Sequence, residues 1–164
     1  MGLFDLLDPT MKWPVVDGPA PDVNRLLLQL DSSRFGAPIE SARALGRPDE
    51  FQRKGVSTKN CKLLYARKGL QLRFGEGKLD EVRFLIGPRS SNHPAFVPAK
   101  PLAPDGSRLT LETTKDRITT IFGQPDPGGS DDETLQIFHG QGVISDFNFD
   151  PDGHLVEWAL YPDD

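Results

Sequence analysis

Side chains that could take part in chemistry are few in this sequence and widely spaced. The histidines are His93, His139 and His154, and we place the last two at strand ends. A zinc site needs such ligands to converge on one point. The stretch DPDG at 150–153, with Asp146 nearby, offers carboxylates, but the late Glu of a calcium-binding loop is missing. We interpret these as turn residues and predict no metal and no cofactor.

A nucleophilic site is not indicated either. Cys61 is the only cysteine, and the neighbouring Lys62 could lower its thiol pKa, but no histidine partner is evident. The sequence lacks the serine-hydrolase elbow, the phosphate-binding loop, the zinc-protease helix and the Cys-x-x-Cys motif. The acidic run at 131–133 is typical of a solvated loop. We therefore predict no catalytic residue and a protein that is not an enzyme.

Charge is distributed unevenly along the chain, whose net charge is -5. Residues 34–89 contain 13 Lys or Arg and 6 Asp or Glu, a net of +7, whereas residues 109–164 contain 2 and 12, a net of -10. Two interpretations stay open. The halves could attract each other across their own junction, or they could form a polarised surface that orients a partner.

Composition excludes several classes of protein. The acidic half would repel phosphates, and the basic half lacks interleaved aromatics, which argues against nucleic-acid binding. No apolar run is long enough to span a bilayer. The N-terminus has no basic segment typical of a signal peptide and no cysteine for lipidation, so we predict a soluble, cytoplasmic protein.

A short phrase occurs twice, as LGRPD at 45–49 and FGQPD at 122–126. In the second copy Ile118, Ile121 and Phe122 have helical spacing, and Gly123 followed by Pro125 is a helix stop. The first copy has the same order, with an apolar stripe at Ile39, Ala42 and Leu45 before Gly46 and Pro48. The phrase therefore predicts the end of a helix in each half.

Alternating apolar residues follow each of these helices. Turns are indicated by GEG at 75–77 and by DPDG at 150–153. GKLDEVRFL at 77–85 aligns with GHLVEWALY at 153–161 at nearly the offset of the repeated phrase, which indicates a tandem duplication. The predicted strands cover 62–67, 70–74, 82–86, 135–139, 143–149 and 155–161.

The sequence thus predicts an α+β fold of two tandem helix–antiparallel meander repeats, with helices on one face of the sheet and the other face open. The predicted boundaries are an N-terminal extension at 1–20, repeat 1 at 21–87, a Pro-rich connector at 88–108 and repeat 2 at 109–164. Within these, 21–30 is ambiguous between helix and strand, and 95–97 is a possible edge strand.

Between about Phe35 and Tyr161, this order of elements resembles the tandem-repeat fold of the beta-lactamase inhibitory proteins, a bacterial family. It is also similar to the SmpA/OmlA-type lipoproteins of outer-membrane assembly. The resemblance implies a sheet face presented to a protein partner. The disulfides of the first family and the lipidated cysteine of the second are absent, so target and location are not inferred from it.

Strand alternation identifies a candidate partner-binding face. If the bulky Val82, Phe84, Trp158 and Leu160 face the helices, the intervening residues face the other way. We therefore predict a protein-binding module of inhibitor, immunity or adaptor type, with an unknown protein partner. A small-molecule binder or enzyme with a pocket between the repeats, and an envelope-associated structural component, stay open as alternatives. The predicted binding residues are Leu79, Glu81, Arg83, Leu85, Leu155, Glu157 and Tyr161.

Overall fold

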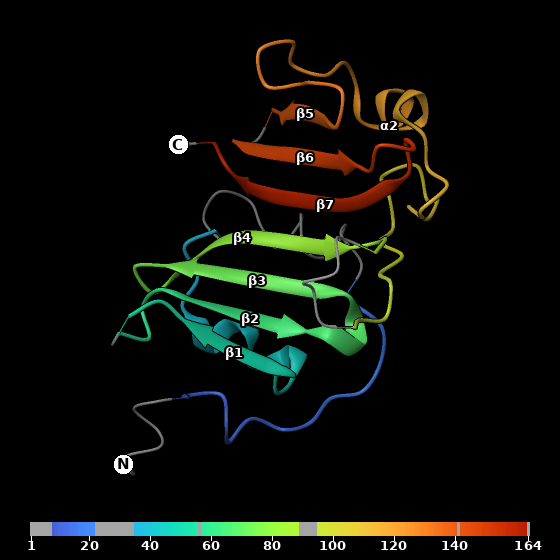
Figure 1. The fold of residues 1–164 in the computed structure, drawn as a ribbon. Helices are drawn as coiled ribbons and strands as arrows, with labels where there is room; N and C mark the ends of the chain where they lie inside the picture. The colour runs from blue at the N-terminus through green and yellow to red at the C-terminus, as the bar shows by residue number, and fades with distance from the viewer. Residues whose placement is uncertain (1–7, 22–34, 56, 89–94, 141, 164) are drawn as a thin grey trace.

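The structure, a computed structural model, describes residues 8–21, 35–55, 57–88, 95–140 and 142–163. Seven strands form one sheet, and the helical segments are short (Figure 1). In chain order the elements are η2 (Ile39–Leu45), β1 (Glu50–Arg53), β2 (Cys61–Tyr65), η3 (Ala66–Lys68), β3 (Leu70–Gly75), β4 (Lys78–Leu85), α2 (Lys115–Phe122), β5 (Thr134–His139), β6 (Val143–Phe149) and β7 (Leu155–Pro162).

The strand order is β1-β2-β3-β4-β7-β6-β5, and every neighbouring pair is antiparallel. Strands β4 and β7 pair directly, with Val82 opposite Leu160 and Phe84 opposite Trp158. The predicted α+β fold of two helix–meander repeats is therefore wrong, because the described residues form a mainly β structure around one continuous sheet. The tandem duplication predicted from the repeated phrase is likewise not supported by this structure.

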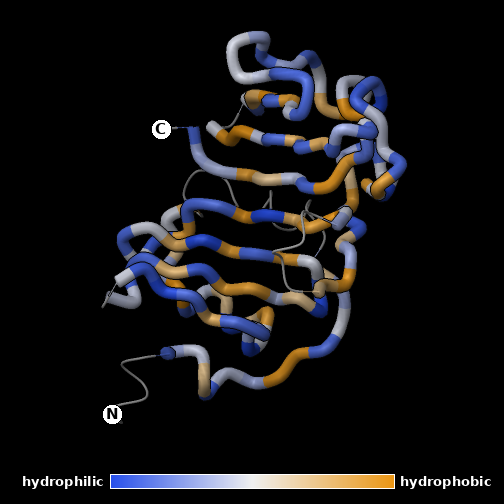
Figure 2. Tube along the Cα trace, viewed as in Figure 1, coloured by the Kyte–Doolittle hydropathy of each residue, from blue (hydrophilic) through white to orange (hydrophobic). Residues whose placement is uncertain are grey.

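The core lies against one face of this sheet, and the strands reach it through alternating apolar side chains. In β3 the alternate residues Leu70, Leu72 and Phe74 are buried, and Gln71 and Arg73 between them are half-buried. Figure 2 shows the resulting change between hydrophobic and hydrophilic positions along the strands. This alternation explains why five strands were predicted within two residues of their observed bounds, whereas β4 was predicted to begin four residues too late.

Two β-bulges interrupt the alternation. Arg73 pairs with Glu81 but Phe74 pairs with Leu79, so Asp80 is an extra residue in β4. Likewise Asn148 pairs with Glu157 but Phe149 pairs with Leu155, so Val156 is an extra residue in β7. A bulge resets the inward and outward alternation of the strand that contains it. Leu79 and Leu155 therefore join the core and do not lie on the predicted binding face.

The two predicted helix ends are present, although only one helix is an α-helix. Helix α2 is capped by the Thr114 side chain, which accepts a hydrogen bond from the Arg117 amide, and it ends at Gly123 (φ +104°). The first segment, η2, is a 3-10 helix that ends at Gly46 (φ +87°) and buries Ala42. Its seven residues are too few to cover a meander alone.

The connector between β4 and α2 has no strand at 95–97, in contrast to the prediction. Its backbone instead makes one bond to η3, from the Val97 amide to the Ala66 carbonyl, and one to β4, from the Ala99 amide to the Leu85 carbonyl, both 2.8 Å. Most of the ambiguous segment 21–30, His93, and the first seven residues of the N-terminal extension lie outside the described residues.

The two margins of the sheet differ. Along β5, the loop at 124–133 covers the outer backbone groups: the Asp126 amide donates to the Gln136 carbonyl at 2.7 Å, and the Asp131 amide donates to the Thr134 carbonyl at 2.9 Å. Strand β1, at the other margin, has only four residues and one strand neighbour. Its exposed side chains include the charged Glu50 and Arg53.

Candidate functional site

The sheet face opposite the core carries rows of polar side chains that run across the strands. Strand pairing aligns Gln52, Lys62, Arg73 and Glu81 in one row, from β1 to β4. A second row continues through both halves of the sheet. Its members, in strand order, are Glu50, Leu64, Gln71, Arg83, Ala159, Asp146 and Gln136.

Ion pairs join these rows at the centre of the sheet. Glu81 accepts from Arg73 (Nη1 to Oε2, 2.9 Å) and from Arg83 (Nη2 to Oε1, 2.7 Å). Arg83 reaches across the β4–β7 junction to Glu157 (Nη1 to Oε1, 3.2 Å), which also accepts from the Asn148 amide at 2.9 Å. The carboxylate side chains are almost fully buried, 6% and 1% exposed, whereas that of Arg83 is 27% exposed. Arginine, with its planar fork of donors, can hold both carboxylates in fixed positions.

Beside this network lies a group of aromatic and amide side chains. The Tyr161 hydroxyl donates to Asp146 at 2.8 Å, and the Gln136 amide donates to both residues. Burial, followed by the bond to Asp146, raises the pKa of Tyr161, so its hydroxyl stays protonated. Phe138, on the same face by alternation with buried Ile137, is 49% exposed. An exposed aromatic next to ordered polar groups is typical of a protein-binding surface.

The structure places five of the seven predicted binding residues on this face: Glu81, Arg83, Leu85, Glu157 and Tyr161. Arg83 and Tyr161 are partly exposed, but Glu81, Leu85 and Glu157 are buried, so the face is less open than predicted. Sequence reasoning missed Phe138, because it left the facing of 135–139 undecided. The sequence did contain a signal: Leu135 and Ile137 are alternate apolar residues that both face the core, which places Phe138 on the other face.

A serine–histidine pair lies on the core side of the sheet. The Trp158 indole donates to the Ser145 hydroxyl at 3.0 Å, which leaves the hydroxyl proton for His139 Nε2, 2.7 Å away. Ser145 is fully buried, so no substrate can reach its oxygen. The arrangement therefore satisfies buried polar atoms and is not a hydrolytic site.

Burial lowers the pKa of His139 below its ordinary value of 6.5. The unfolded chain therefore binds more protons than the folded chain in the range below that value. We expect the free energy of unfolding to fall as pH falls from about 7 to about 5.5. His139→Gln should remove this part of the loss in urea titrations at the two pH values. His154→Gln, at an exposed histidine, should retain it; equal slopes for the two variants would contradict the assignment.

The predicted turn at DPDG is present and holds a small cluster of possible ligands. Ligand atoms of Asp150, Asp152 and His154 lie within 4.8 Å of one another. Asp150 accepts from the Asp152 and His154 amides, at 3.0 and 2.8 Å, and the bond from the His154 amide lowers the pKa of its carboxyl. These are the bonds that form such a turn, so the geometry is explained without a metal ion.

Cys61 is buried, and burial, with smaller contributions from Asp8 and Asp80, raises the pKa of its thiol to about 11. The thiolate is the reactive form, so this cysteine is inert near neutral pH. The structural environment thus opposes the effect that Lys62 could have had on the thiol.

Comparisons with known proteins give no family. No family model matches the chain, and no curated protein sequence matches it. One solved structure is similar, an extracellular protein containing an SCP domain from Bacillus anthracis str. Ames, with 10% identity and a TM-score of 0.43. The match covers 93% of this chain and 49% of that one, so the chain spans about half of its length. The resemblance to the beta-lactamase inhibitory proteins and the cytoplasmic location stay predictions.

Among the described residues, no helix is long and apolar enough to cross a membrane.

Proposed function

We propose that this chain is a protein-binding module that uses the sheet face carrying the Arg73–Glu81–Arg83–Glu157 ion pairs. The observation that carries the proposal is the fixed position of these charges on the same sheet face as the exposed ring of Phe138, which lies on the edge strand β5. A partner that binds here meets side chains that are already ordered. Little side-chain entropy is then lost on association, which favours affinity.

The chemistry of the face defines what a partner must present. Phe138 offers an exposed aromatic contact at the β5 end, in the same row as the partly exposed Tyr161 and the buried Ile144. Arg83 and Gln71 offer donors nearer the centre, and both are partly exposed. A complementary surface would place an apolar pocket over Phe138 and acceptor groups over Arg83.

Replacement of Phe138 tests the proposal. A partner is first captured with the wild-type protein and purified. In calorimetric titration we expect Phe138→Ser to weaken its binding by about tenfold or more, because aromatic anchors dominate such interfaces. The matched control is Val97→Ser, which removes another exposed apolar side chain (56% exposed) from the connector, away from this face. Equal binding by both variants and the wild type would show that the partner uses another surface.

A further inference from the structure

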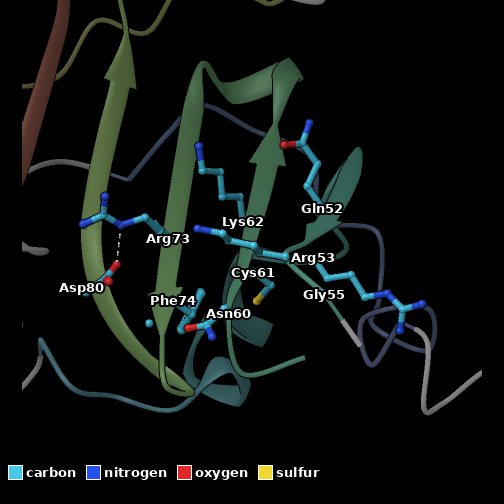
Figure 3. A pocket seen from close by; sticks show the side chains of 11 residues that line it. Gln52, Arg53, Gly55, Asn60, Cys61, Lys62, Arg73, Phe74 and Asp80 are labelled. Carbon is cyan, nitrogen blue, oxygen red and sulfur yellow. Dashed lines mark hydrogen bonds and ion pairs between the residues drawn. The ribbon is translucent and has the colours of Figure 1, made fainter. Parts of the chain in front are cut away.

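A basic pocket lies on the same sheet face as the ion pairs, at the end of β1, β2 and β3 (Figure 3). Its volume is about 600 Å³, within the range of small-molecule sites. The charged side chains around it are four cations and one carboxylate: Arg53, Lys54, Lys62, Arg73 and Asp80.

The charge of Arg73 is compensated inside the protein. Its Nε donates to Asp80 at 2.8 Å, the dashed contact in Figure 3, and its Nη1 donates to Glu81 at 2.9 Å. Asp80 is the bulge residue of β4. A Cβ atom added to Gly75 would lie only 2.4 Å from the Asp80 carboxylate, which is too close. A larger residue at Gly75 would therefore displace Asp80 from the arginine. The bulge and the glycine together build one wall of the pocket.

The charges of Lys54 and Lys62 have no such compensation. Both side chains are exposed, and within the described part of the chain neither makes an ion pair. Lys62 lies directly opposite Arg73 on β3 and opposite the neutral Gln52 on β1. Because Asp80 and Glu81 already compensate the charge of Arg73, the charges left for an anion in the pocket are those of the two lysines.

We propose that this pocket binds a compact small molecule that carries phosphate or carboxylate groups. The open lysines supply point charges, which bind phosphate and carboxylate oxygens without demanding the planar geometry of an arginine fork. The inference does not depend on the protein-binding role: both involve Arg73, but the anion site rests on Lys54 and Lys62 and not on Phe138 or Arg83.

Calorimetric titration of the full chain with pyrophosphate and with citrate, at low salt, tests the site and distinguishes the two anion chemistries. We expect at least one to bind, with an affinity that falls as salt is added. Lys62→Gln should weaken that binding about tenfold, as expected for one charged hydrogen bond. Lys54→Gln should weaken it in the same direction.

Lys100→Gln is the matched control. It makes the same charge change at an exposed lysine that lines a second basic pocket, beside Arg67 and Lys68. It should leave binding unchanged. Loss of binding in this variant, with none in Lys62→Gln, would move the site and overturn the proposal, as would absence of binding by both anions.

Thermal unfolding supplies a readout that separates binding from folding. The anion that binds should raise the melting temperature of the wild type by ligand linkage, and raise that of Lys62→Gln less. Without an anion, Lys62→Gln should melt at about the same temperature, because the Lys62 side chain is exposed and makes no ion pair within the described residues. A lower melting temperature without an anion would contradict the uncompensated charge on which the proposal rests.

Discussion

Trp158→Ala is expected to lower the free energy of unfolding by about 3–5 kcal/mol, the range for removing a large aromatic side chain from a core. Trp158 is fully buried on β7, next to the β4–β7 junction. Its ring stacks on Phe147 with centroids 5.3 Å apart and contacts Phe122 of α2 at 5.2 Å and Phe84 of β4 at 5.6 Å. One side chain thus joins both halves of the sheet to the helix.

Urea unfolding followed by circular dichroism measures this loss. Tryptophan fluorescence is unsuitable, because the mutation removes one of the two tryptophans. The control is Phe138→Ala, which truncates an exposed aromatic on the same sheet and should cost less than about 1 kcal/mol. If the two variants lost similar stability, the aromatic cluster would not be what holds the two halves together.

Arg83→Met is expected to destabilise the protein by about 2–4 kcal/mol, although methionine keeps most of the side-chain length. The reason is the position of Glu81 and Glu157, whose almost fully buried carboxylates both bind the Arg83 guanidinium. Removing one member of a buried ion pair leaves the charge of the other uncompensated, which costs about 3–5 kcal/mol. Arg83 is partly exposed, and solvent screens part of its charge, so our expected value is about 1 kcal/mol lower than that range.

A second substitution tests whether charge is the cause. Adding Glu157→Gln to Arg83→Met removes one of the stranded charges and should recover part of the lost stability, so that the two changes are not additive. Lys62→Met, at an exposed position on the same face, should change stability by less than about 0.5 kcal/mol. Additive losses in the double variant would show that packing, and not the ion pair, accounts for the effect.

The local elements could be predicted from the sequence because their signals are local. Gly46 and Gly123 end their helical segments as expected, and strand alternation located six of the seven strands. Strand β1 was missed because EFQR is polar and too short to show a period of two. These successes concern stretches of a few residues, in which backbone geometry and neighbouring side chains decide the outcome.

The arrangement of those elements could not be predicted in the same way. Pairing of β4 with β7 depends on contacts between residues far apart in the chain, such as Phe84 and Trp158. The bulges at Asp80 and Val156 shift the facing of Leu79 and Leu155, and no residue pattern in the strands announces them. The facing of the central residues Glu81, Arg83 and Glu157 therefore followed from strand alternation, whereas that of Leu79 and Leu155 did not.

The unequal margins of the sheet limit how copies of this protein can assemble. A β-sheet polymerises only if both of its edges accept new strands, because each added copy must offer a fresh edge to the next. Here the loop at 124–133 already occupies the β5 edge at Thr134 and Gln136. Among the described residues this leaves β1 as the edge at which a strand could add, and two copies joined there would form a closed pair with no edge for a third. The loop thus blocks growth of the sheet at its β5 edge.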